Sequence, residues 1–155
     1  KVLDFGLVKA DVPGQLELTA ANATLGTPLY MSPEAVNTPH QVGERSDLYS
    51  LASVGYELLT GETVFCGTSL GEVLLHQVRS LPAKPSARMK QPVSADLEDL
   101  LMRCLAKEPA ARPASATELE DALGRCASSG KWTRREAEEW WRQHGAGQGQ
   151  TQAKV

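Results

Sequence analysis

Aromatic side chains are scarce in this chain of 155 residues: they make up 5% of it, against 41% for all hydrophobic residues. A core built from this sequence must therefore consist mainly of Leu, Val and Ala. Long hydrophobic runs are also missing, because no apolar stretch approaches the ~20 residues that a membrane-spanning helix needs. No signal peptide is recognisable either. The length is typical of a single domain.

A large excess of charge of one sign is equally absent, since the formal net charge is −3. A balance this mild gives no reason to expect a nucleic acid or an anionic membrane surface as a partner. Cysteine is limited to Cys66, Cys104 and Cys126, which are widely spaced and show no metal-ligand pattern. We interpret them as reduced thiols in the core of a cytoplasmic protein.

Two short motifs near the start of the chain carry the functional information. Residues 2–6 read Val-Leu-Asp-Phe-Gly, a short apolar strand followed by a carboxylate, an aromatic and a glycine that permits a sharp turn. Alone, the tripeptide Asp-Phe-Gly is a weak signal, because most such tripeptides are ordinary turns. Residues 26–34 then read Gly-Thr-Pro-Leu-Tyr-Met-Ser-Pro-Glu. At this distance the pair resembles the two ends of the activation segment of Ser/Thr protein kinases.

The resemblance extends over residues 1–126 and is to the C-terminal lobe of the kinase domain, most like that of the bacterial Hanks-type members. It implies a mainly α-helical fold with a short N-terminal strand, one half of a two-lobed α+β fold. It implies an activation segment over residues 4–34 and a helical core over residues 46–126. Residues 127–144 would then form an extension helix, and the low-complexity residues 145–155 a disordered tail.

The resemblance also assigns chemistry to individual residues. The family uses the Asp of Asp-Phe-Gly to bind the Mg²⁺ that bridges the phosphates of ATP, so Asp4 would do this here, with Phe5 and Gly6 in structural roles. Thr27 would hydrogen-bond the catalytic Asp and help to place the acceptor hydroxyl, which favours protein substrates with Ser or Thr acceptors. The alternatives are a solvated Asp4 in a turn and a plain Gly-Thr-Pro turn at Thr27.

Two stretches predict connections. Residues 7–25 contain few large apolar side chains and a Pro-Gly pair, which is typical of a mobile loop. Thr19 and Thr24 in this loop are candidate phosphorylation sites, because a phosphate there can order the loop against basic side chains. The alternative is that both are ordinary loop threonines. Residues 80–93 are rich in proline and predict a second connection.

Three further residues have structural roles in the family. Glu34 stands where a helix N-terminus favours an anion, and it would form a buried ion pair with Arg112. Asp47 would accept hydrogen bonds from the backbone of the catalytic loop. A carboxylate that meets the dipole of its own helix is the alternative for Asp47, and the two roles are compatible.

Apolar spacing and capping residues predict the helices. A helix over residues 46–60, with Ser46 as its N-cap and Gly61 as its stop, has apolar side chains on nearly every face and should be buried all round. The last helix contains Trp140 and Trp141, which we expect to pack against the body of the protein. Further N-caps are predicted at Ser69, Ser94, Ser115 and Thr133.

Three classes of function compete. The first is an enzyme, a part of a Ser/Thr kinase whose complete form transfers the γ-phosphoryl group of ATP. Its Gly-rich loop, strand Lys, helix Glu, catalytic Asp and Mg²⁺-binding Asn are absent from these 155 residues. We therefore expect a fragment that lacks the N-terminal half of its own kinase domain and does not catalyse alone.

The second class is a pseudokinase-like protein-binding module, against which an intact Asp-Phe-Gly argues. The third is a helical scaffold with chance motifs, which the ordered series of motifs disfavours.

Overall fold

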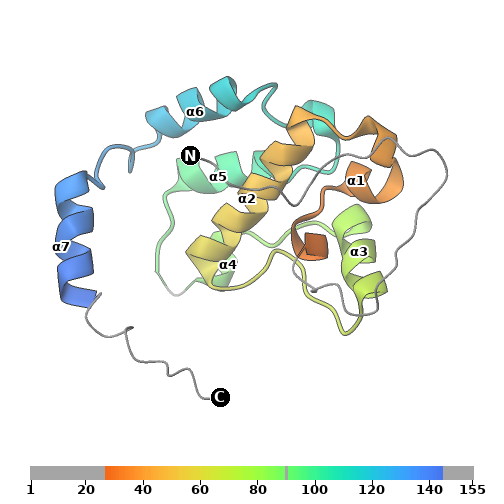
Figure 1. Ribbon diagram of the computed structural model, residues 1–155, viewed down its shortest axis with the longest axis horizontal. Helices are drawn as coiled ribbons and strands as arrows, with labels where there is room; N and C mark the ends of the chain where they lie inside the picture. The colour runs from red at the N-terminus through yellow and green to blue at the C-terminus, as the bar shows by residue number, and fades with distance from the viewer. Residues whose placement is uncertain (1–26, 90, 145–155) are drawn as a thin grey trace, which may run out of the picture.

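The computed structural model describes residues 27–89 and 91–144, which form helices joined by loops (Figure 1). The expected N-terminal strand and disordered tail lie outside these residues. Over the described residues, the prediction of a mainly helical fold is confirmed. The elements are η1 (Thr27–Tyr30), α1 (Pro33–Asn37), η2 (Pro39–Gln41), α2 (Glu44–Thr60), α3 (Leu70–Arg79), α4 (Pro85–Arg88), α5 (Ala95–Cys104), η3 (Pro109–Ala111), α6 (Ala116–Arg125) and α7 (Arg134–His144).

Helix α2 lies in the middle of the molecule and contacts η1, α4 and α5 (Figure 1). It ends as predicted at Gly61, whose φ of 74° is the left-handed conformation that glycine adopts without strain. The predicted N-cap is wrong, because the helix begins at Glu44 and Gly43 is its cap. Ser46 lies inside the first turn instead. Its hydroxyl accepts from the Gly43 N–H at 3.4 Å and donates to another element.

The core lies where α2 meets α5, α6 and the loop after α2. Although aromatic residues are few, Tyr49, Tyr56 and Phe65 are all buried in it, so the expectation of a core made mainly of Leu, Val and Ala is incomplete. Cys104 and Cys126 are buried as predicted, whereas Cys66 is exposed because it lies in a loop rather than on an apolar helix face. The buried cluster comprises Leu48, Tyr49, Ala52, Tyr56, Val64, Phe65, Leu100, Cys104, Leu105, Leu119 and Cys126.

One face of α2 is not buried, contrary to the prediction from its apolar sequence. Leu51, Val54 and Leu58 form a stripe along the helix, and Leu58 is 82% exposed. Together with α5 and α6 this stripe lines an apolar groove of about 350 Å³. No helix of residues 27–89 and 91–144 packs over it. The amount of apolar sequence in a helix does not reveal which of its faces finds a neighbour.

The remaining helix ends follow their predicted caps closely. Ser69, Ser115 and Thr133 each accept a hydrogen bond from the backbone N–H three residues further on, which fixes the first turns of α3, α6 and α7. The Ser94 side chain instead donates to Asp96, so α5 has no side-chain cap at that position. The expected connection over residues 80–93 contains the short helix α4, which begins at a proline.

Helix α7 lies at the edge of the molecule (Figure 1). The expectation that Trp140 and Trp141 pack against the body is wrong, because both are exposed. The two indoles pack edge to face on each other, and Trp140 stacks on His144 with ring centres 4.6 Å apart. Local contacts on the helix thus replace the expected tertiary ones. Among the described residues, none of the helices combines the length and the apolar character that crossing a bilayer requires.

The exposed stripe on α2 leads to a first prediction. Leu58→Lys should leave the unfolding midpoint of the 155-residue chain nearly unchanged, because the side chain already faces solvent. The same change should lower the binding of the dye ANS, because it breaks up the exposed apolar face. Dye fluorescence and urea unfolding followed by circular dichroism measure the two effects. Leu100→Lys is the buried control and should abolish cooperative unfolding; equal effects of both variants would contradict the structure.

Candidate functional site

The structure describes part of the site that the sequence predicts. Thr27 begins η1. Glu34 lies in α1, and Asp47 in the first turn of α2. Arg112 follows η3 directly. The predicted site residues outside the described part of the chain are Asp4, Phe5, Gly6, Thr19 and Thr24.

The structure brings Glu34 and Arg112 together. Two hydrogen bonds join them side by side, from Arg112 Nη1 to Glu34 Oε1 at 2.6 Å and from Nη2 to Oε2 at 2.8 Å. This is the paired geometry in which a planar guanidinium matches a carboxylate. The Arg112 side chain is 0% exposed, so solvent does not screen the pair. Ion pairs this deeply buried depend on full hydrogen bonding of both partners.

Arg112 meets that requirement with its other donors. Its Nε donates to the carbonyl of Ala106 at 2.9 Å, and its remaining Nη hydrogens donate to the carbonyls of Arg45 and Lys107 at 2.8 and 3.1 Å. All five N–H groups of the guanidinium therefore have acceptors. The aromatic ring of Tyr49 lies beside it, 5.0 Å from the guanidinium carbon. The charge thus fixes α1, the start of α2 and the segment after α5 relative to one another.

Glu34 is held in its ionised form by its partners. Burial alone would raise the pKa of this carboxyl group. The hydrogen bonds from Arg112 and from Ser46, whose hydroxyl lies 2.5 Å from Glu34 Oε1, outweigh burial and lower the pKa to about 2. Ser46 therefore serves the ion pair, which explains why it is not the helix cap that its sequence position predicts.

Tyr30, at the end of η1, is anchored to α2 by two side chains. Its hydroxyl donates to Glu57 Oε2 at 2.6 Å, and its carbonyl oxygen accepts from Ser50 Oγ at 2.9 Å. The hydrogen bond to Glu57, more than burial, raises the pKa of the Tyr30 phenol above its usual value. Sequence reasoning missed Ser50 and Glu57. Their signal was two polar residues on one face of an apolar helix, two turns apart.

Asp47 is exposed and makes no side-chain hydrogen bond or ion pair to any residue in the described ranges. It stands in the first turn of α2, where a carboxylate is stabilised by the positive end of the helix. Its implied contact with the backbone of a catalytic loop remains a prediction.

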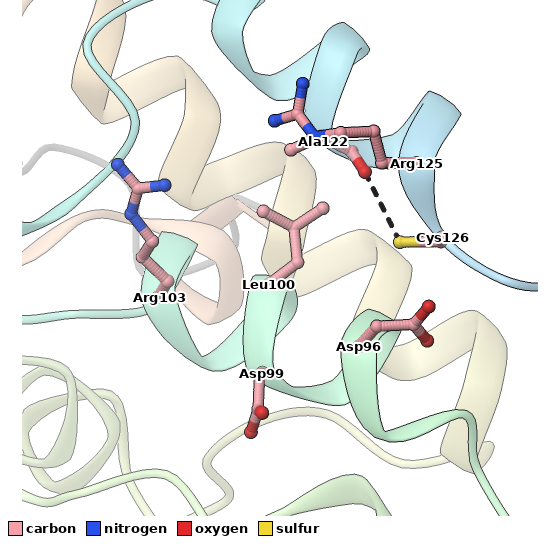
Figure 2. A pocket seen from close by; sticks show the side chains of 7 residues that line it. All are labelled: Asp96, Asp99, Leu100, Arg103, Ala122, Arg125 and Cys126. Carbon is pink, nitrogen blue, oxygen red and sulfur yellow. Dashed lines mark hydrogen bonds between the residues drawn. The ribbon is translucent and has the colours of Figure 1, made fainter.

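A second hollow, of about 320 Å³, lies between α5 and α6 (Figure 2). Its charged side chains point away from one another rather than towards a shared ligand position. Asp96 accepts from the Ala127 N–H at 2.6 Å, and Arg103 pairs with Glu118 at 2.6 Å. Cys126, which follows α6 directly, donates weakly to the Ala122 carbonyl of that helix, and burial raises the pKa of its thiol. This hollow therefore shows no assembled site, and no His, Cys, Asp or Glu cluster suited to a metal occurs among the described residues.

The chain is also similar in sequence to known proteins. Residues 1–123 match the protein kinase domain family. Among curated relatives, the serine/threonine-protein kinase PknB of Mycobacterium tuberculosis H37Rv is 42% identical over 125 residues, which cover 81% of this chain and 20% of the relative. The serine/threonine-protein kinase Pkn1 of Myxococcus xanthus is 40% identical over 124 residues, 79% of this chain and 17% of that relative.

These similarities place the chain in a family. It belongs to the protein kinase domain family, and its relatives are bacterial serine/threonine-protein kinases. The chain spans about a fifth of the length of the curated relatives it matches. Family membership implies the use of ATP and Mg²⁺ in general terms.

A second prediction concerns the buried ion pair. Arg112→Met should destabilise the 155-residue chain by about 3–5 kcal/mol, because it leaves the Glu34 carboxylate buried without a counter-charge. Arg103→Met is the matched control: it removes an arginine from an exposed pair with Glu118, which solvent screens, and should change little. Urea unfolding followed by circular dichroism measures both. A similar decrease in the free energy of unfolding for the two variants would show that the buried pair contributes no more to stability than the exposed one.

A third prediction follows from the pKa of Glu34. Because the fold lowers this pKa from 4.5 to about 2, its contribution of about 3 kcal/mol is complete above pH 4.5 and is lost as the pH falls towards 2. Thermal unfolding midpoints between pH 3 and 6 report the loss. Other carboxylates also titrate there, so the decisive comparison is with Glu34→Gln, which should depend less steeply on pH. An unchanged slope in that variant would refute the assignment.

Proposed function

We propose that the protein carrying this chain is a Ser/Thr protein kinase, which transfers the γ-phosphoryl group of ATP to Ser or Thr hydroxyls of protein substrates. The observation that carries the proposal is the paired attachment of the segment that follows Thr27. Its start is bound to α2 through Tyr30, and its end is bound to Arg112 through Glu34. A segment held at both ends can keep an acceptor hydroxyl in a defined place, which is the main requirement of phosphoryl transfer.

Asp4 is the residue we propose for Mg²⁺. Its carboxylate is the hard oxygen ligand that this cation prefers, and no competing ligand cluster occurs among the described residues. ATP and Mg²⁺, when bound, supply the phosphoryl group and neutralise charge that develops on it. Thr27 would orient the acceptor, and the Gly-Thr-Pro sequence around it favours Ser or Thr. Phosphate on Thr19 or Thr24 would order the segment further.

The domain organisation follows from the same proposal. Residues 1–126 would form the C-terminal lobe, residues 127–144 an extension, and residues 145–155 a tail. The two buried thiols, Cys104 and Cys126, support a reducing compartment such as the cytoplasm. Nothing in the structure or the relatives favours the alternative of a non-catalytic binding module. The 155 residues lack the parts that cradle the ATP phosphates, so we expect no catalysis by this chain alone.

A fourth prediction tests the function directly. We would fuse the part of Mycobacterium tuberculosis PknB that precedes the matched region to residues 1–126 of this chain. The fusion should phosphorylate Ser or Thr of a basic acceptor protein with ATP and Mg²⁺. Asp4→Asn should lower the rate about a hundredfold or more, because it removes an electrostatic stabiliser of the transition state. The time course of labelled phosphate incorporation measures the rate, and phosphoamino acid analysis of the acceptor identifies the residue type.

The outcomes separate the candidate functions. Thr27→Ser keeps a hydroxyl and is the conservative control for Thr27→Val, which should reduce transfer. A fusion that unfolds cooperatively and binds ATP but transfers no phosphate would favour the binding-module alternative. Transfer to tyrosine rather than to Ser or Thr would contradict the proposed acceptor class.

A further inference from the structure

Gln77 of α3 is fully buried, with 0% of its surface exposed. A buried amide side chain must satisfy both its donors and its acceptor. Here the Nε2 group donates to the carbonyl of Leu29 at 2.7 Å and, more weakly, to that of Pro28 at 3.4 Å. The Oε1 atom accepts from the hydroxyl of Tyr49 at 2.6 Å. One side chain of α3 therefore holds the backbone of η1.

The chemistry of the partners fixes the orientation of this amide. The carbonyl oxygens of Pro28 and Leu29 can only accept, so the NH₂ group of Gln77 must face them. The carbonyl oxygen of the amide then faces Tyr49, whose hydroxyl donates to it. A reversed amide would set two acceptors against each other at η1. The three groups thus form a series of hydrogen bonds in which every donor points the same way, from Tyr49 through Gln77 to the backbone of η1.

Lys107 supports this series of hydrogen bonds from the side of Tyr49 and the Gln77 main chain. Its ammonium group donates to the main-chain carbonyl of Gln77 at 2.7 Å and lies 3.4 and 3.5 Å from the His76 carbonyl and the Tyr49 hydroxyl. It also lies over the ring of Phe65, 4.3 Å from the centre. The ammonium therefore occupies the C-terminal turn of α3, where a cation is favoured. Burial and the nearby Arg112 lower the pKa of Lys107 to about 8, so it is charged at neutral pH.

We call the hydrogen bonds of Gln77 with Tyr49, Lys107 and the backbone of η1 the clamp; it shares its support with the buried ion pair. The carbonyl of Lys107 accepts from Arg112, and Arg112 holds Glu34. The short stretch 106–112 therefore reaches both ends of the segment between Pro28 and Glu34. Through Lys107 and Gln77 it reaches the beginning of that segment, and through Arg112 the end. One short stretch thus fixes the segment at both of its ends through polar contacts.

We propose that Gln77, oriented by Tyr49 and Lys107, is a positioning residue. It fixes the position of the Thr27–Tyr30 backbone relative to α3 and thereby determines the affinity for the acceptor substrate. The inference rests on the proposed kinase function and adds to it a residue outside the motifs. Gln77 acts through the backbone of η1 and does not touch the reacting atoms. Its loss should therefore change how well an acceptor binds without changing how ATP binds.

The fifth prediction concerns Gln77→Met in the full-length protein that carries these residues. Methionine is of similar size but cannot donate to the carbonyls of η1. The KM for a Ser- or Thr-containing acceptor peptide should rise about tenfold, the scale of one or two lost hydrogen bonds. The KM for ATP and the slow hydrolysis of ATP by water should stay unchanged. Gln143→Met, on exposed α7, is the matched control and should alter none of these constants.

Hydrogen–deuterium exchange in the 155-residue chain gives a readout that needs no catalysis. Gln77→Met should speed exchange over residues 29–31 and leave α5 unchanged. Faster exchange throughout the chain, or an equal rise in both KM values, would mean a merely structural role and overturn the inference. Full-length wild-type protein without phosphotransfer would instead refute the proposed function, while the exchange experiment would still decide the role of Gln77.

A milder variant covers the case in which methionine prevents folding. Tyr49→Phe removes one hydroxyl and leaves the donors of Gln77 in place. It should raise the KM for the peptide about threefold, with the KM for ATP again unchanged. An unchanged KM for the peptide in an active, folded Tyr49→Phe protein would overturn the proposal.

Discussion

The buried ion pair of Glu34 and Arg112 is the interaction on which the rest of this structure depends. A buried charge is tolerated only when every polar atom around it is satisfied, and the five donors of Arg112 meet carboxylate and carbonyl oxygens from three separate segments. Each of those segments is thereby held in one place. Ser46 gives up its expected role at the start of α2 to complete the same network. Electrostatic satisfaction, rather than helix propensity, decides the local geometry here.

Polar groups also determine how the segment around Tyr30 is held. The hydrophobic effect is non-directional, whereas hydrogen bonds to backbone carbonyls have narrow limits of distance and angle and so fix the position of a segment. Gln77, Ser50 and Glu57 reach the residues around Tyr30 from two different helices. A small apolar core supplies compactness, and a few buried or half-buried polar side chains fix the position of the segment around Tyr30.

The sequence was informative where structure is local. The caps at Ser69, Ser115 and Thr133 and the stop at Gly61 depend on residues within one turn, so pattern alone located them. The meeting of Glu34 with Arg112 was suggested only by resemblance, since no local rule links such distant residues. Features set by tertiary neighbours were missed. Cys66, the exposed stripe beginning at Leu51, and the clamp at Gln77 all depend on what packs, or does not pack, against them.

The separation of Glu34 from Arg112 along the chain has a consequence for how the protein is made. The partners are 78 residues apart, so the contact closes a long loop and brings a corresponding loss of chain entropy. Synthesis proceeds from the N-terminus, and Glu34 leaves the ribosome well before its partner exists. During that interval its carboxylate must stay in water. The segment from Thr27 to Glu34 is therefore the first described part to be synthesised, and its tie to Arg112 can form only after residue 112 has been made.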